Sequence, residues 1–128
     1  MGYYMNQKGS QFYISSTDKE DALTALKDFA KTHNQLMWVD NDILMAATTL
    51  KDALQECRWN VEEDDRGNIV DIYFDGEKIG NDELIFNSIA KYIRSDSYIQ
   101  MLGEDGCMWR WVFYRARCKQ IYPTVEWE

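Results

Sequence analysis

The sequence lacks several features on which common protein functions depend. It has one proline, one histidine and no apolar run near the roughly 20 residues that cross a bilayer. Residues Met1 to Ser10 lack the hydrophobic core of a signal peptide, so we expect a cytoplasmic protein. The three cysteines, Cys57, Cys107 and Cys118, have no CxxC spacing, which favours reduced thiols. These absences argue against a membrane protein and against a secreted domain held by disulfides.

The sequence also lacks a catalytic motif. His33, the only histidine, lies at the end of a predicted helix without a serine or cysteine nucleophile in a recognisable setting. Residues Asp64 to Gly67 put an arginine where a calcium loop needs a ligand. Residues Gly103 to Gly106 lack the helix that follows a phosphate-binding glycine loop. We therefore expect no enzymatic activity, no cofactor and no bound metal.

Negative charge is what the sequence has in excess. Asp and Glu total 22 against 14 Lys and Arg, which gives a net charge of -8. Residues 60–83 contain nine acidic and two basic side chains, so this segment carries most of the imbalance. A surface of this kind repels the phosphates of nucleic acids and membranes and attracts basic proteins. We therefore expect a basic protein surface as the partner, and no direct contact with nucleic acid or membrane.

The acidic segment has two interpretations. In the functional one, its carboxylates imitate the phosphates of a nucleic acid or pair with the Arg and Lys side chains of a basic groove. In the other, a solvated hairpin keeps a small protein soluble. The candidate partner-binding residues are Glu62, Glu63, Asp64, Asp65, Asp71 and Asp75.

Length and composition predict one ordered domain over residues 1–128. Hydrophobic residues make up 45% of the chain and aromatic residues 14%, which is more than a disordered acidic protein carries. Residue patterns predict seven strands, at Gln11 to Ser15, Leu36 to Val39, Val61, Ile69 to Phe74, Tyr98 to Leu102, Cys107 to Tyr114 and Gln120 to Trp127. They also predict three helices, which begin at Thr17, at Thr49 and at Asn81 or Asp82. This order predicts an α+β fold with a largely antiparallel sheet and about three helices packed mainly on one face.

The predicted strand from Cys107 to Tyr114 is unusually aromatic. Alternation places Trp109, Trp111 and Phe113 on the same face as Cys107, and we expect this face in the core. The opposite face is either covered as well, or forms a platform that anchors proteins or stacks bases. An alternative site, a pocket for a nucleotide-like small ligand with Arg110 as anion anchor, comprises Tyr98, Trp109, Arg110, Trp111 and Tyr114.

Basic residues follow in and after this strand, namely Arg110, Arg115, Arg117 and Lys119. They could bind phosphate, but the net charge favours a role in neutralising the acidic hairpin. Cys57 and Cys107 lie on predicted core faces, whereas Cys118 is expected to be exposed.

Four further segments are informative together: Gly2 to Met5, Arg66 to Phe74, Gly103 to Gly106 and Trp109 to Phe113. With them the chain resembles, over nearly its full length, a family of small acidic proteins of uncharacterised role in bacteria and their phages. The resemblance brings no catalytic residues. For a phage-encoded protein, the expected cytoplasmic location would be the cytoplasm of the host. Small acidic proteins of mobile elements include inhibitors of host defence, such as anti-CRISPR proteins that occupy nucleic-acid grooves. That analogy rests on size and charge.

The leading hypothesis is a non-enzymatic acidic binding protein, an inhibitor of phage or mobile-element origin that occupies a basic, nucleic-acid-handling surface of its partner. The small-ligand pocket is the first alternative. The second is a structural or oligomer-forming protein in which a strand from Tyr122 to Trp127 pairs at an exposed sheet edge.

Overall fold

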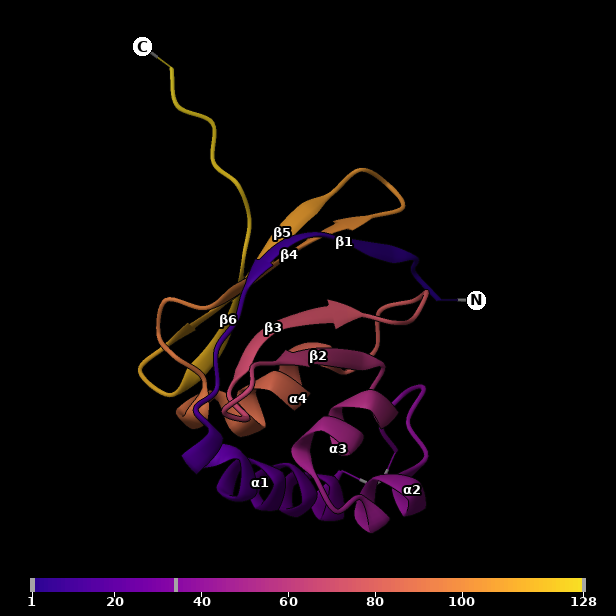
Figure 1. The fold of residues 1–128 in the computed structure, drawn as a ribbon. Helices are drawn as coiled ribbons and strands as arrows, with labels where there is room; N and C mark the ends of the chain where they lie inside the picture. Colours follow the sequence, from indigo (N-terminus) through magenta and orange to yellow (C-terminus); the bar gives the residue numbers. More distant parts are fainter. Residues whose placement is uncertain (1, 34, 128) are drawn as a thin grey trace.

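A computed structural model describes residues 2–33 and 35–127. The strands are β1 (Met5–Gln11), β2 (Trp59–Glu63), β3 (Ile69–Phe74), β4 (Tyr98–Gly103), β5 (Met108–Tyr114) and β6 (Arg117–Ile121). Four of them form an antiparallel sheet in the order β1-β4-β5-β6, and β2 pairs with β3 in an antiparallel hairpin (Figure 1). The predicted α+β class and its largely antiparallel sheet are confirmed.

The helices lie together on one side of the strands (Figure 1). They are α1 (Lys19–Thr32), α2 (Asn41–Ala46), α3 (Leu50–Glu56) and α4 (Asp82–Ile89), with short 3-10 turns at Ser16–Asp18 and Ala90–Tyr92. Thr49 caps α3 as its sequence predicts, because its hydroxyl accepts the Asp52 N–H at 3.1 Å. The helical side buries the core and leaves the other face of β4, β5 and β6 without a covering helix, as far as the described residues extend.

Strand β1 and the residues just after it join the hairpin to the sheet. Ile14 and Ile69 exchange backbone hydrogen bonds just beyond the end of β1, at 3.0 and 2.9 Å. Further along, the register of β1 shifts between Gln7 and Gly9, and the Gln7 amide bridges the gap to β3. Its Nε2 donates to the Ile72 carbonyl at 2.9 Å, and its Oε1 accepts the Phe74 N–H at 2.6 Å. The hairpin is therefore fixed against the sheet by hydrogen bonds.

The core is an aromatic cluster between strands and helices. Phe86 of α4 packs against Trp59, Trp111 and Phe113, with ring centroids 5.0, 5.9 and 6.0 Å away. Trp109 is also buried, so the predicted burial of this face of β5 is confirmed for its aromatic residues. The pairs with Trp59 and Phe113 are edge-to-face, and such contacts add about 0.5 to 1.5 kcal/mol each beyond the area they bury.

Three predicted strands are wrong in position or type. The first strand ends at Gln11, where prediction began it, because β1 is a polar segment without hydrophobic alternation. Residues Leu36 to Val39 form a turn in which Trp38 takes a φ of 64°, and a helix that the patterns did not predict, α2, follows. The last strand is Arg117–Ile121. Pro123, which has no N–H to donate to a sheet, lies beyond it in an extended tail that projects from the body (Figure 1).

Two cysteine predictions are also wrong. Cys107 lies in the turn before β5 and is exposed, whereas Cys118 points inward from β6 and is buried. Burial raises the pKa of the Cys118 thiol to about 12, and it raises the pKa of Cys57, which is buried as predicted, to about 12 as well. Cys107 is therefore the accessible thiol of the three.

Candidate functional site

The β2–β3 hairpin carries the predicted carboxylates on a rigid support. Trp59, Val61 and Ile72 point into the core, and the alternate positions face outward. Glu62 lies opposite Asp71 across the hairpin, and Tyr73 follows with 46% of its surface exposed. The Asp71 carboxylate, with a smaller contribution from Glu62, raises the pKa of the Tyr73 phenol. The outward side of the hairpin therefore presents an exposed aromatic ring between carboxylates.

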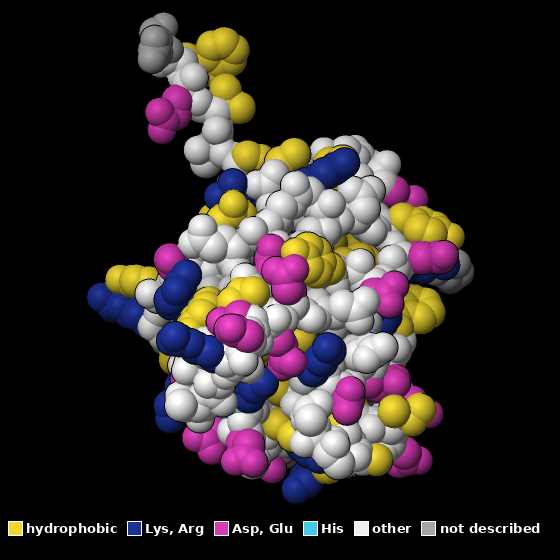
Figure 2. Space-filling view, in the orientation of Figure 1, with side chains coloured by type: hydrophobic (Ala, Val, Ile, Leu, Met, Phe, Trp, Pro, Cys, Tyr) yellow, Lys and Arg dark blue, Asp and Glu magenta, His cyan; other side chains and the backbone are white. Residues whose placement is uncertain are grey.

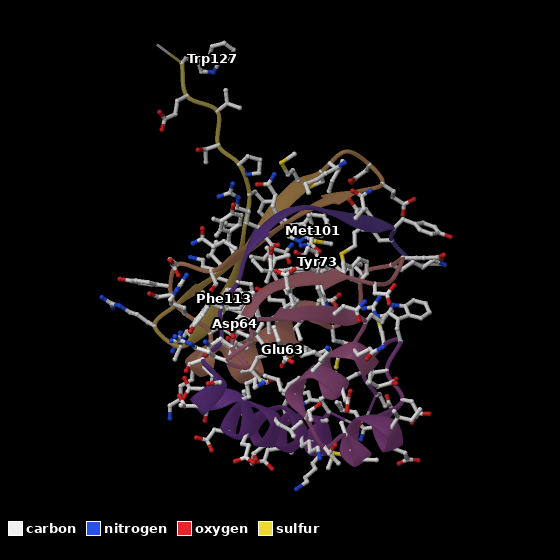
Figure 3. The ribbon with its side chains drawn as sticks, viewed as in Figure 1. Glu63, Asp64, Tyr73, Met101, Phe113 and Trp127 are labelled. Carbon is white, nitrogen blue, oxygen red and sulfur yellow. The ribbon has the colours of Figure 1, made fainter. Side chains whose placement is uncertain are left out.

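Two of the predicted residues hold the hairpin turn (Figure 3). The Asp64 carboxylate accepts the N–H groups of Arg66 and Asn68 at 3.0 and 2.9 Å and the Asn68 side-chain amide at 3.1 Å. The Asn68 hydrogen bond is the main reason that the pKa of Asp64 lies below its ordinary value. Glu63 pairs with Lys19 of α1 at 2.8 Å. The carboxylates of Asp64 and Glu63 therefore stabilise the fold.

The other four carboxylates differ in how firmly they are held. Asp71 accepts the Ser10 hydroxyl of β1 at 2.6 Å, and Asp75 accepts the Asn60 amide at 3.2 Å. The side chains of Glu62 and Asp65 are exposed and form no hydrogen bond or ion pair with any described residue. We define the acidic face as Glu62, Asp65, Asp71, Tyr73 and Asp75.

A shallow groove of about 490 Å³ runs between β1 and β3 beside the acidic face, and Ser10, Asp71 and Tyr73 line it. Figure 2 shows acidic side chains around the middle of this side of the molecule. Tyr73, labelled in Figure 3, was absent from the predicted site. The alternation of β3, which puts Tyr73 on the same side as Asp71, could have identified it.

Asp82 belongs to the same acidic stretch but has a structural role. Its side chain is 0% exposed and accepts the Trp59 indole N–H at 2.9 Å and the Gly80 N–H at 2.9 Å. The Arg58 guanidinium pairs with it at 3.2 Å. A partner can therefore reach fewer acidic groups than the sequence of residues 60–83 suggests.

The residues of the alternative ligand pocket lie on two sides of β5. Trp109 and Trp111 are 3% and 0% exposed in the core, whereas Arg110 and Tyr114 point to solvent. Arg110 lies over the ring of Tyr98, 4.4 Å from its centroid. The strand backbone separates the two tryptophans from the other three side chains, so the five do not line one pocket.

The basic residues near β5 do not neutralise the hairpin. Among the ion pairs within residues 2–33 and 35–127, the hairpin carboxylate Glu63 is paired by Lys19, and none involves Arg110, Arg115, Arg117 or Lys119. The expected internal role of these four cations is therefore absent from the described residues, and their charge faces solvent.

No group of three or more His, Cys, Asp or Glu residues suited to a metal occurs in the described parts of the chain. His33 stacks on Phe29 at the end of α1, with ring centroids 4.3 Å apart. Within the same residues, no helix has the length and apolar character needed to span a membrane.

The fold and the site define a single-domain α+β protein with an acidic outer hairpin. No family model, no curated protein and no solved structure matches the chain.

Proposed function

We propose that this domain is a non-enzymatic binding protein whose acidic face occupies a basic surface of a partner protein. The observation that carries the proposal is the exposed Tyr73 ring set between carboxylates on a hairpin that is fixed to the sheet. Tyrosine is enriched among the residues that contribute most binding energy, and a surrounding polar rim excludes water from such contacts.

The geometry favours binding because little order has to be gained. Asp71 and Asp75 are already held by hydrogen bonds from Ser10 and Asn60, so a partner does not bear the entropy of fixing them. Glu62 and Asp65 remain available for ion pairs with Lys or Arg. Their charge accelerates encounter with a basic partner and makes the complex sensitive to salt.

A basic surface of this kind is typical of proteins that handle nucleic acid. The proposal therefore extends to an inhibitor of a nucleic-acid-processing or defence enzyme, encoded by a phage or mobile element and acting in the host cytoplasm. Its support is the negative charge of the acidic face together with the size of the domain.

The test is affinity capture from a bacterial lysate with three forms of the domain. The binding variant reverses exposed carboxylates that do not hold the turn, Glu62→Lys, Asp65→Lys and Asp75→Lys. A control variant makes the same change of net charge on α1, with Glu20→Lys, Asp21→Lys and Asp28→Lys, which are also exposed. Asp64 and Glu63 are left intact because they stabilise the hairpin.

We expect a basic protein to be captured by the wild type and the α1 control, to be released by salt, and to be lost with the hairpin variant. A protein lost equally with both variants would show that net charge alone was responsible, and capture by all three would exclude the acidic face.

A further inference from the structure

The solvent side of β4, β5 and β6 carries basic and aromatic residues and no carboxylate at its strand positions. Cross-strand pairing places Tyr98 beside Val112 and Val112 beside Lys119, while Gln100 lies beside Arg110. Tyr114 pairs with Arg117 at the end of the hairpin. We define the open sheet face as Tyr98, Gln100, Arg110, Val112, Tyr114, Arg117 and Lys119. The chain has 22 acidic residues, yet the charged side chains at these strand positions are all basic, so the basic charge is separated from the acidic charge.

Arg110 is held against the Tyr98 ring on this face. Its guanidinium lies 4.4 Å from the centroid of the Tyr98 ring, and its Nε donates to the Gln100 Oε1 at 2.7 Å. The guanidinium therefore lies over the tyrosine ring, and because Arg110 is exposed an incoming base can reach it. A hollow of about 300 Å³, bounded by Arg110, Ile121 and Tyr122, adjoins it.

The tip of the β5–β6 hairpin presents a second basic and aromatic pair. Tyr114 is 63% exposed, and Arg115 lies 5.2 Å from its ring centroid. Arg115 and Ala116 both have positive φ, 53° and 63°, in a two-residue turn that normally takes Asn-Gly. Figure 2 shows basic side chains at the left edge of the molecule, near this hairpin. A strained turn thus carries an arginine beside an exposed ring at the edge of a basic surface.

The backbone of β6 is closed to strand addition where α4 covers it. The Cys118 N–H donates to the Asn87 Oδ1 at 2.9 Å, and the Gln120 N–H donates to the Glu83 Oε2 at 3.1 Å. A partner here must therefore be bound by side chains and not as an added strand. The Glu83 carboxylate borders a wide groove of about 1310 Å³, whose other wall includes Arg115, Arg117 and Lys119.

We propose that the open sheet face binds single-stranded nucleic acid. Arg117 and Lys119, with Arg115 at the hairpin tip, contact phosphates, while bases stack on the guanidinium of Arg110 and the ring of Tyr114. The combination of basic charge with exposed rings distinguishes this occupant from an acidic protein, for which the charges alone would suffice. The net negative charge opposes binding only weakly, because charges are screened beyond about 8 Å at physiological salt.

This proposal is independent of the acidic face, and its test uses a different probe. Fluorescence anisotropy is measured with a labelled single-stranded oligonucleotide of about 16 nucleotides, which is as long as the largest site of an OB fold, over a series of salt concentrations. The binding variant is Arg117→Gln with Lys119→Gln. Its control is Lys31→Gln with Lys51→Gln, two exposed lysines on the helical side.

We expect binding that weakens as salt rises. The Arg117 and Lys119 variant should make the negative slope of log K, the association constant, against log[salt] less steep by about 0.7 for each lost phosphate contact. Tyr114→Ala should weaken binding by about tenfold, from lost stacking, without changing that slope. The Lys31 and Lys51 control variant should bind as the wild type does.

Three outcomes would overturn the proposal. They are no salt-dependent binding, equal binding of a duplex of the same length, and equal binding of polyglutamate with no effect of Tyr114→Ala. The last outcome would assign the face to an acidic protein.

Discussion

Among single residues, Asp82 shows most clearly how burial changes the role of a charge. It is completely buried and accepts hydrogen bonds from Arg58 Nη2, the Trp59 indole and the Gly80 N–H at once. Arg58 itself has a φ of 73° and links β2 to the segment before α4 through the Lys78 carbonyl. Removing one partner of such a pair leaves the other buried without a counter-charge.

Asp82→Ala is therefore expected to lower the free energy of unfolding by about 3 to 5 kcal/mol. Urea denaturation followed by tryptophan fluorescence measures this loss. Glu77→Ala removes an exposed carboxylate nearby and should change stability by about 0.5 kcal/mol or less. A similarly small effect of Asp82→Ala would show that the pair does not hold α4 against β2.

Among the elements, the β5–β6 turn is the one whose sequence suits its shape least. Left-handed backbone costs a non-glycine residue about 1 to 2 kcal/mol, and Arg115 and Ala116 both adopt it. Arg115→Asn with Ala116→Gly should stabilise the domain by about 1 to 2 kcal/mol, because the turn then has its preferred residues. The urea midpoint reports the change.

In the β4–β5 turn, a substitution can introduce the backbone strain that the β5–β6 substitutions relieve. Gly106 has a φ of 84°, and a Cβ there would meet no atom within 4 Å, so only backbone strain opposes a side chain. Gly106→Ala should destabilise the domain by about 1 kcal/mol. If neither turn responds in the expected direction, backbone strain is not what limits the stability of these hairpins.

The parts of the fold and of the site that have a local sequence pattern could be predicted, whereas the parts set by contacts between distant residues could not. The helix from Thr49, the strand Ile69–Phe74 and the buried side of β5 have local signals of capping or alternation, and each was found. Strand β1 has the polar sequence MNQKGSQ and is positioned by long-range bonds from Gln7, which no local pattern contains. The site was predicted as a segment, but the division of its carboxylates into structural and exposed groups follows from partners distant in sequence, such as Lys19 and Ser10.

At the scale of the whole molecule, charge of opposite sign is separated onto different surfaces. The acidic face lies on the β2–β3 hairpin, and the basic open sheet face lies on β4, β5 and β6. We propose that these are two binding surfaces of opposite preference, although the net charge of -8 suggests only one. Steering by either surface should weaken as salt rises.

The most direct test of the central claim is zero-length cross-linking of the domain in a bacterial lysate, with the linked residues mapped by mass spectrometry. A carbodiimide joins a carboxylate to a lysine amine as an amide, with loss of water, only where the two are in contact. We predict links from Glu62, Asp65 or Asp75 to lysines of one basic partner, suppressed by high salt. Links from α1 carboxylates such as Glu20 at equal frequency, or none from the hairpin, would contradict the claim that the acidic face is a binding surface.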